Sequence, residues 1–420
     1  MPEIKHFRGV VYNQNLVNIS KVVTPPYDVI SPEDKIYYQN LSDYNIVNLL
    51  LEDALSGNNE VENKYTRTAR HFKEWLDCGV LIRDEVPGFY IYAHEYPHEG
   101  KIKTRLGFIG LMRIADEDGE ILPHENIFEK TKIDRLMLLK EVKANLSPIF
   151  SVFDDPQKRV ENLLADFASH NNPRIIISKD EVTHKVWSIT DNAFIREIRE
   201  YLRDTPFFIA DGHHRYESAR LYRELMRSNI GRFTGDESFN YVMSYFVSWT
   251  DKGLTILPTH RIVSKLDSEK IRHLMTANFL IEEVETYDEM VNKMQEVVND
   301  NPPTLIGVYN GKKFSLLRFK EGKLNENISV TRLKSSAIRD LDVTILHSLL
   351  IPKDADVQFT RDPNEVIFTV RLNPDSFGFF LNPIRVEDIK RVALSGERLP
   401  HKSTYFYPKL LSGLVINRLD

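Results

Sequence analysis

Apolar and polar residues follow two patterns along this chain, and together they predict an intermixed series of strands and helices. Short apolar runs rich in aromatic and β-branched residues are typical of buried strands, whereas apolar residues three and four positions apart predict amphipathic helices. The expected strands include residues 7–12, 22–24, 89–96, 104–114, 174–178, 184–189, 207–210, 241–249, 255–261, 304–309, 313–318 and 365–370. The expected helices include residues 61–76, 136–144, 157–169, 191–202, 213–229, 268–278, 286–299, 337–350 and 385–391. The mixture indicates an α/β or α+β fold.

Local signals place the ends of several elements. Ser31, followed at once by Pro32 and three residues later by Asp34, predicts a helix that begins with a capping box. Asp211 is expected to cap the helix over 213–229. The turn at His98-Glu99-Gly100 is expected to join two strands into a hairpin.

The length of the chain and one polar loop suggest two domains. At about 150 residues per domain, 420 residues favour two or three domains. The loop that contains Gly231 and Gly235 is the best candidate for a boundary. We therefore expect a domain over 1–232, which includes the hairpin as an insertion, and a second α/β domain over 233–420.

Composition narrows the class of protein. A hydrophobic fraction of 42% and a net charge of −6 are typical of a soluble globular protein, and they argue against a broad nucleic-acid surface. The single cysteine, Cys78, excludes an intramolecular disulfide and a cysteine metal cluster. Without an N-terminal apolar run or a stretch long enough to span a bilayer, we expect a cytoplasmic protein with neither nucleic acid nor membrane as partner.

The most informative stretch is Phe207-Phe208-Ile209-Ala210-Asp211-Gly212-His213-His214-Arg215-Tyr216-Glu217. It predicts a buried strand, a glycine turn at Gly212 and the start of a helix. His213, His214 and Arg215 would then stand beside the unpaired N–H groups of the first turn, which together favour an anion. The alternative is a set of capping and core residues. Polar groups this dense are costly to bury without a ligand, so we favour a binding site.

Three further polar clusters are candidates for the same site. Pro25-Pro26 would hold Asp28 in a rigid turn. A second cluster contains His124 and Glu125, and a third contains His260 and Arg261 after Pro258. For each, the alternative is an ordinary solvated loop or turn.

A fourth cluster resembles a phosphate loop without being one. Residues 396–403 nearly spell G-x-x-x-x-G-K-[ST], but His401 replaces the second glycine, so we reject a true P-loop. Lys402, Ser403 and Thr404 are nevertheless suited to phosphate oxygens. A lysine on a solvated loop is the alternative.

These motifs resemble a large bacterial and archaeal family of uncharacterised conserved proteins. The resemblance rests on segments spread over nearly the whole chain: Val23–Ser31, Pro123–Glu125, Asp134-Arg135, the Asp-Gly-His-His-Arg-Tyr-Glu segment 211–217, Pro258–Arg261 and Lys402–Lys409. It does not supply an activity.

A second resemblance is shorter and does suggest an activity. Residues 212–219 are similar to motifs of sulfiredoxin and of ParB nucleotide-binding domains, whose superfamily includes free serine kinases. It implies a ParB/sulfiredoxin-like N-terminal core that binds nucleotide phosphates at the turn and helix start. Sulfiredoxin's catalytic cysteine falls on His213 here, which rules out sulfinic acid reduction.

The implied function is the ATP-dependent phosphorylation of a small hydroxyl metabolite, with free L-serine as the first guess. In this scheme Asp28 is the catalytic base, Glu125 and Asp211 are substitutes for it, and Lys402 or Arg261 neutralises charge during transfer. The nucleotide, as ATP or ADP, would be held by Asp211, Gly212, His213, His214, Arg215, His260, Arg261, Ser403 and Thr404. Asp211 would instead help to hold Mg²⁺ in a variant of this scheme. The segments 258–261 and 400–409 are expected to close over the site.

Two other functions compete with this one. A metal-dependent hydrolase would use His124, Glu125, His213, His214 and His260, although no pair has the spacing that places two ligands on one helix face. A non-catalytic nucleotide sensor would bind without turnover. The expected partners are a nucleotide and a small-molecule substrate, and a homodimer is compatible with the sequence.

Overall fold

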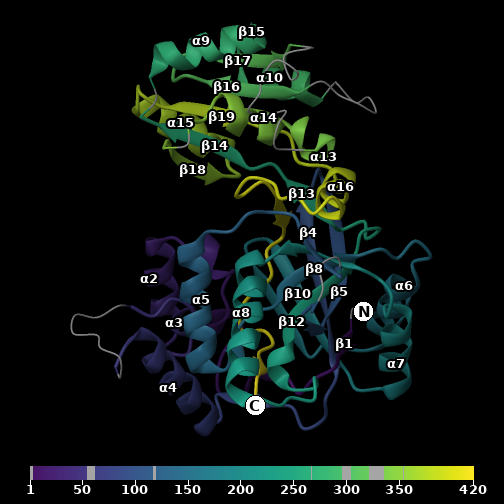
Figure 1. Cartoon of the computed structure of the whole chain (residues 1–420). Helices are drawn as coiled ribbons and strands as arrows, with labels where there is room; N and C mark the ends of the chain where they lie inside the picture. The colour runs from purple at the N-terminus through teal and green to yellow at the C-terminus, as the bar shows by residue number, and fades with distance from the viewer. Residues whose placement is uncertain are drawn as a thin grey trace. The chain divides into compact units, whose positions relative to one another are not determined.

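The structure is a computed structural model, and it describes residues 3–53, 62–116, 120–265, 267–295, 304–320, 335–352 and 354–420. The chain divides into two compact units (Figure 1). The first unit contains residues 1–122, 127–255 and 408–420, and the second contains residues 123–126 and 256–407. Both combine helices with strands, which confirms the predicted mixed α/β class.

The first unit is built on a mixed sheet, which has nine strands among the described residues. Its order is β6-β11-β8-β12-β5-β4-β10-β9, and β1 pairs with β5. The bounds are β1 (Ile4–Lys5), β4 (Phe89–His98), β5 (Lys101–Arg113), β6 (Ile121–Pro123), β8 (Ile149–Phe153), β9 (Ile175–Lys179), β10 (Val182–Ile189), β11 (Phe207–Asp211) and β12 (Tyr241–Ser248). Two short pairs join β2 (Val10–Tyr12) to β3 (Leu81–Arg83) and β7 (Ala144–Asn145) to β21 (Asn417–Arg418). The expected hairpin is β4 with β5.

The first unit also contains helices and two short 3₁₀ turns. They are α1 (Ile19–Val22), the 3₁₀ turn η1 (Tyr27–Val29), α2 (Pro32–Leu41), α3 (Val47–Leu50), α4 (Lys64–Asp77), α5 (Glu129–Val142), α6 (Arg159–His170), α7 (Asn192–Tyr201), α8 (His213–Ile230) and the 3₁₀ turn η2 (Ser238–Asn240). The capping box at Ser31 is confirmed. The expected strand over 22–24 is wrong, because the Asn18 side chain caps a helical turn that ends at Val22.

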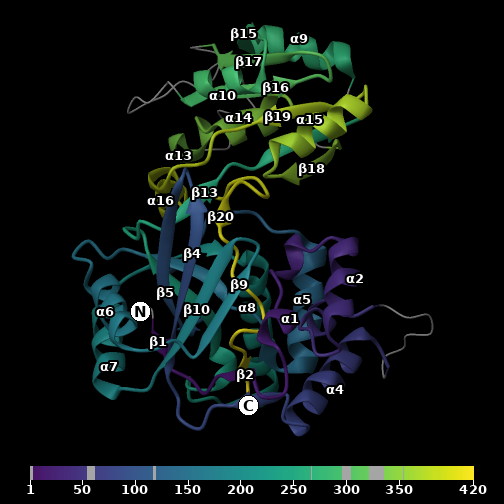
Figure 2. The same ribbon diagram turned by 180° about the vertical axis from the view of Figure 1, so that it is seen from behind.

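The two faces of this sheet differ in chemistry. One face packs apolar residues against α5, α6, α7 and α8, and in Figure 1 α5 and α8 run side by side. The opposite face carries buried polar side chains and is crossed by the C-terminal segment, which is yellow in Figure 2. Two of the bonds that hold this segment are made by Arg105, which donates to the Pro408 carbonyl, and by the Leu411 N–H, which donates to the Tyr92 hydroxyl. Polar groups buried on this face need partners, and the returning chain supplies some of them.

The second unit is built on an antiparallel sheet of six strands among the described residues, in the order β15-β17-β16-β19-β14-β18. Its strands are β14 (His260–Ser264), β15 (Phe279–Val284), β16 (Leu305–Tyr309), β17 (Phe314–Phe319), β18 (Asp356–Thr360) and β19 (Phe377–Phe380). Its helices are α9 (Ser268–Asn278), α10 (Tyr287–Gln295), α13 (Ser336–Arg339), α14 (Asp342–Leu349), α15 (Pro363–Leu372) and α16 (Val386–Leu394). A separate short pair joins β13 (Thr255–Leu257) to β20 (Tyr405–Tyr407).

Two expectations for this half of the sequence differ from the structure. The expected strand over 365–370 is wrong, because Asp362 caps a helix whose first residue is Pro363. The expected strand over 255–261 is interrupted at Pro258, where β13 has ended and β14 has not begun. Of the expected helix over 286–299, residues 296–299 lie outside the described ranges.

The boundaries between the two units differ from the boundary expected at the loop near Gly231. Strand β12 belongs to the first unit because it pairs with β5 and β8 in the middle of the sheet. The last residues of the chain return to the first unit, and residues 123–126 belong to the second. A boundary at 232/233 would remove β12 from its own sheet.

Candidate functional site

The junction between β11 and α8 is shaped by Gly212. Its φ of 88° lies in the left-handed region, and a Cβ atom there would lie 2.9 Å from Nη2 of Arg215 and 3.0 Å from Cγ2 of Ile149. Glycine is therefore required both by the backbone and by the close approach of the guanidinium group. Gly212 itself is the N-cap residue of α8, so the expectation that Asp211 caps this helix is wrong.

Asp211 lies between two positive charges. Its Oδ2 atom is 3.5 Å from Nη2 of Arg215, and its Oδ1 atom is 3.3 Å from Nζ of Lys409. Nη1 of Arg215 also donates to Oγ of Ser147 at 2.9 Å and to the carbonyl of Pro148 at 2.5 Å. A guanidinium group with this many fixed partners is held in one orientation. A metal ion at Asp211 would be repelled by both cations, so this carboxylate is poorly suited to Mg²⁺.

The two histidines at the start of α8 are anchored within the protein. His213 is buried. Nε2 of His214 accepts a hydrogen bond from the backbone N–H of Phe128 at 2.9 Å, and the two rings stack with their centroids 6.2 Å apart. The lone pair on Nε2 of His214 therefore accepts a hydrogen bond from Phe128, the residue that precedes α5.

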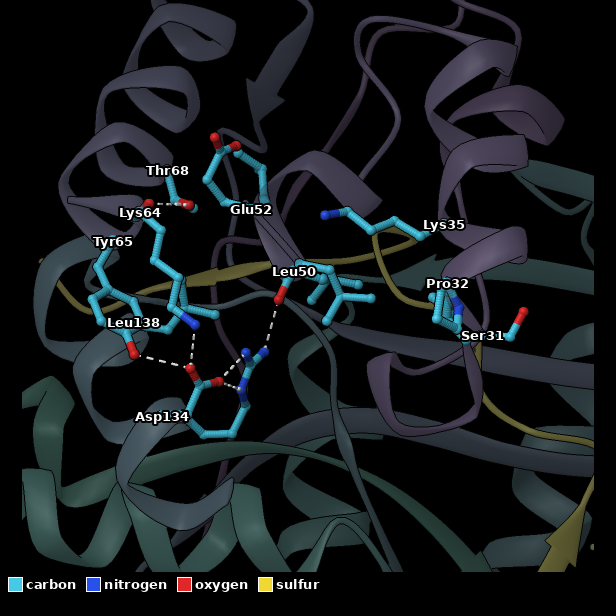
Figure 3. A pocket seen from close by; sticks show the side chains of 14 residues that line it. Ser31, Pro32, Lys35, Leu50, Glu52, Lys64, Tyr65, Thr68, Asp134 and Leu138 are labelled. Carbon is cyan, nitrogen blue, oxygen red and sulfur yellow. Dashed lines mark hydrogen bonds and ion pairs between the residues drawn. The ribbon is translucent and has the colours of Figure 1, made fainter. Parts of the chain in front are cut away.

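A cavity of about 350 Å³ opens between α2, α3, α4 and α5 (Figure 3). At its floor, Asp134 accepts hydrogen bonds from Lys64 at 2.6 Å, from the Tyr65 hydroxyl at 2.9 Å and from Arg135. Partial burial alone would raise the pKa of Asp134, but the Arg135 guanidinium and these hydrogen bonds hold it at about 2. The carboxylate is thus charged at physiological pH, and it holds Lys64 and Arg135 by ion pairs.

A smaller cleft of about 60 Å³ adjoins this cavity. Both are lined by Leu50, Arg135 and Leu138, so they share a wall. The smaller cleft is also lined by Tyr27, Arg215 and Ser147, and the Arg135 guanidinium lies 4.4 Å from the centre of the Tyr27 ring. The cleft therefore brings together two arginines from α5 and α8.

Asp28 belongs to the turn that borders both hollows. It is an exposed residue of η1, between Tyr27, which lines the smaller cleft, and Ile30, which lines the larger cavity. Pro26 precedes this turn with an extended backbone, as the sequence suggested. Arg215 therefore lines the smaller cleft, Asp28 is the chain neighbour of Tyr27, which also lines it, and Asp211 and Gly212 directly precede α8.

The polar face of the sheet holds buried residues that are not among the predicted site residues. Arg105, His94 and His184 stand in register on three neighbouring strands, and all are buried. The Arg105 guanidinium lies 4.9 Å from the centre of the Phe150 ring, and Phe150 is the register partner of Asp211. Through Phe150, these polar residues of β5, β4 and β10 are linked to Asp211 at the end of β11.

Burial decides the charge of these two histidines. Burial, together with the positive charge of Arg105, lowers the pKa of His184 to about 3 and that of His94 well below its ordinary value. Both rings are therefore neutral at physiological pH. Nδ1 of His184 is 2.8 Å from the Tyr92 hydroxyl oxygen, and this oxygen accepts a hydrogen bond from the Leu411 N–H of the C-terminal segment.

The second unit gathers the other predicted residues, and here Glu125 has a structural role. Its carboxylate accepts hydrogen bonds from the backbone N–H groups of Lys402, Ser403 and Thr404 at 2.8, 3.1 and 3.4 Å. Lys402 has a φ of 55°, which turns these donors toward one point. The turn that resembled a phosphate loop thus binds an anion supplied by this chain. Buried His124 lies beside it, with Nε2 3.1 Å from Oγ1 of Thr404.

Arg261 and His260 are interior residues of the same unit. Arg261 is fully buried and donates to the carbonyls of Thr259 and Lys402. Burial lowers the pKa of Arg261 to about 10, and burial with the charge of Arg261 lowers the pKa of His260 to about 4. Arg261 therefore supports the turn that holds Glu125, rather than presenting its charge to solvent.

The structure brings together two separate sets of predicted residues. Within the first unit lie Asp28, Asp211, Gly212, His213, His214 and Arg215; within the second lie Glu125, His260, Arg261, Lys402, Ser403 and Thr404. A single site made from both sets stays a prediction. In the described ranges there is no group of three or more His, Cys, Asp or Glu side chains placed to hold a metal ion.

No curated protein matches the chain, and none of the described helices is long and apolar enough to cross a membrane. Among solved structures, C-terminally truncated SbnI from Staphylococcus aureus has a TM-score of 0.36 and 10% identity over 72% of this chain and 85% of its own. A free serine kinase variant in complex with AMP has a TM-score of 0.37 and 10% identity over 71% and 87%. A conserved hypothetical protein from Pyrococcus furiosus has a TM-score of 0.36 and 13% identity over 74% and 94%.

The chain also matches a sequence family. The model described as "Protein of unknown function (DUF1015)" matches residues 4–344, which is most of the chain. This confirms the uncharacterised family expected from the motifs, and the chain belongs to the DUF1015 family.

Proposed function

We propose that the first unit transfers a phosphoryl group from ATP to the hydroxyl of a small molecule, with free L-serine as the first acceptor to test. The observation that carries the proposal is the cleft lined by Arg135 and Arg215, which shares a wall with a cavity of metabolite size. Two guanidinium groups in one cleft suit phosphate oxygens, since each offers several fixed N–H donors.

This arrangement gives the nucleotide, the acceptor and the base separate places in the first unit. The phosphates of the nucleotide bind at Arg215, Arg135 and the first turn of α8, whose N–H groups favour anions. The acceptor occupies the larger cavity. We assign the base to Asp28, whose turn carries Tyr27 at the smaller cleft and leads to Ile30 at the larger cavity.

The chemistry balances without any other reactant. The acceptor oxygen forms a bond to the γ-phosphorus of ATP, while the bond between that phosphorus and the β–γ bridging oxygen breaks and ADP leaves. The carboxylate of Asp28 takes the hydroxyl proton and later returns it to water. The two arginines stabilise the charge on the transferring group, and such positioned cations supply most of the catalysis in phosphoryl transfer.

Lys409 and Asp211 position Arg215 in this scheme. The Asp211 carboxylate faces Arg215 on one side and Lys409 on the other, so the guanidinium is oriented before any ligand arrives. Preorganised cations lose less entropy on binding than mobile ones do.

The test combines thermal shift with turnover. The purified chain is mixed with ATP or ADP and Mg²⁺, with and without L-serine, and both melting temperature and ADP formation are recorded. We expect ATP to raise the melting temperature by mass action, Arg215→Ala to abolish that rise, and Asp28→Asn to keep it while losing turnover about 10²–10⁴-fold. Matched controls are Arg220→Ala on the same helix and Asp43→Asn at an exposed loop position.

Three results of this test would contradict the proposal or one of its parts. Nucleotide stabilisation with no turnover on any acceptor would identify a sensor and overturn the kinase proposal. Full turnover in Asp28→Asn would remove Asp28 as the base. Equal losses in Arg215→Ala and Arg220→Ala would show that the arginine cleft is not the nucleotide site.

A further inference from the structure

We infer that the cavity between α2 and α4 binds a small hydroxy acid with one carboxylate, and that such a compound fits it better than a zwitterion does. The inference concerns the acceptor of the proposed phosphoryl transfer and in that respect rests on it. The binding of the acid itself, however, is inferred from the charged and apolar side chains that line the cavity.

Two lysines reach the cavity from opposite walls. Figure 3 shows Lys35 extending from α2 and Lys64 extending from α4, with Leu50 between them. Lys35 pairs with Asp53 at 2.5 Å, and Lys64 pairs with Asp134 at 2.6 Å. Both ammonium groups are therefore held near the cavity by carboxylates, and a ligand carboxylate would add a partner to each.

The ion pairs around the cavity have an excess of one positive charge. Asp53 and Asp134 face three cations, and Glu52 faces one more, Arg67, at 3.4 Å. The described partners in these pairs are the basic residues Lys35, Lys64, Arg67 and Arg135 and the acidic residues Glu52, Asp53 and Asp134. A ligand with one net negative charge neutralises this network, whereas a zwitterionic amino acid leaves the excess in place.

The remaining lining limits the size and character of the ligand. A volume of about 350 Å³ is at the small end for binding sites, which suits a metabolite rather than a macromolecule. Much of the wall is apolar, from Ile30, Pro32, Leu49, Leu50, Leu51 and Leu138. A short carbon skeleton would therefore pack against leucines while its carboxylate meets the lysines.

The proposal is tested by binding without nucleotide. Calorimetry is performed on the full chain with glycerate, 3-hydroxybutyrate, L-serine and glycerol as the probes. We expect both hydroxy acids to bind at least about tenfold more tightly than L-serine or glycerol, since a charged hydrogen bond contributes this much. Lys35→Gln and Lys64→Gln should each remove most of that preference. Lys73→Gln, an exposed lysine on α4, is the matched control.

The variants are checked for folding by their circular dichroism spectra and melting temperatures, so a lost preference in a folded variant reports on the cavity. Tighter binding of L-serine or glycerol than of the acids, or an unchanged preference in both folded lysine variants, would overturn the inference. Binding of the acids, with no ADP formed from ATP in the presence of either the acids or L-serine, would leave this inference standing and refute the proposed transfer.

Discussion

The Nζ atom of Lys409 lies 3.3 Å from Oδ1 of Asp211, and the second oxygen of that carboxylate faces Arg215 at 3.5 Å. Two residues from distant parts of the sequence thus join the C-terminal segment to the start of α8. Arg105 fastens the same segment one residue earlier, through the carbonyl of Pro408. The C-terminal segment thus supplies one of the two cations that flank Asp211, and Asp211 in turn is one of the partners of Arg215.

Replacing Lys409 should disturb Arg215 more than it disturbs the fold. In Lys409→Gln, Asp211 keeps Arg215 as its partner but loses the ammonium, and we expect a loss of about 1–2 kcal/mol in the free energy of unfolding. The guanidinium should then be drawn toward Asp211, and the ATP-dependent rise in melting temperature should shrink. Lys21→Gln, at an exposed position on α1, is the control and should change neither quantity. An unchanged ATP response in Lys409→Gln would mean that Arg215 needs no such support.

A substitution at Gly212 should be costly for two separable reasons. Gly212→Ala places a side chain at a positive φ and brings its Cβ within 3.0 Å of Arg215 and Ile149. Gly231→Ala, at the other end of α8, has a φ of 71° but nothing within 4 Å. We expect about 1–2 kcal/mol of destabilisation from the backbone alone at Gly231 and a larger loss at Gly212. Urea denaturation of both variants measures the difference, and equal losses would show that the close approach to Arg215 has no energetic weight.

Glu125→Gln should destabilise the second unit. The carboxylate accepts three backbone N–H bonds from residues 402–404, whereas an amide offers one oxygen and directs its own N–H groups at those donors. We expect about 1–3 kcal/mol of lost stability and faster hydrogen exchange at residues 402–404. Glu129→Gln, at the exposed start of α5, is the control. Exchange rates that stay equal in both variants would contradict the structural role of Glu125.

The sequence predicted the elements whose signals are local. The capping box at Ser31, the hairpin of β4 and β5 and the strand–glycine–helix junction at Gly212 all depend on neighbouring residues, and all three are present. The segment over 365–370 failed because its β-branched residues favour a strand, although Asp362 and Pro363 begin a helix there. That helix then packs its apolar side on β14 and β19. Tertiary packing outweighs the weak local preference.

The sequence predicts only those site residues that are close together along the chain. Asp211, Gly212 and Arg215 are consecutive or nearly so, and their chemistry can be recognised in the sequence. Lys409 stood in a motif, yet its role depends on a return of the chain that no local pattern indicates. Arg105 occupies a strand whose polar positions look solvent-exposed until the C-terminal segment covers them.

The buried histidines should make stability fall in mild acid. The pKa of His184 is lowered to about 3 by burial and by the charges of Arg105 and Lys179, whereas in the unfolded chain it is near its ordinary value of 6.5. Between these values the unfolded state binds more protons than the folded state. The stabilisation is therefore complete above about pH 6.5 and decreases as the pH falls through that window.

His184→Gln isolates this contribution. Glutamine can still meet the Tyr92 hydroxyl but takes up no proton, so the stability of the variant should depend less on pH. We expect the gap between the unfolding free energies of wild type and variant to change by up to about 1.4 kcal/mol per pH unit below pH 6, in favour of the variant. Urea denaturation at several pH values between about 5 and 7 measures it, and His170→Gln on the exposed side of α6 is the control. Parallel curves for wild type and His184→Gln would mean that the ring takes up its proton without unfolding, and that the polar face of the sheet is open to water.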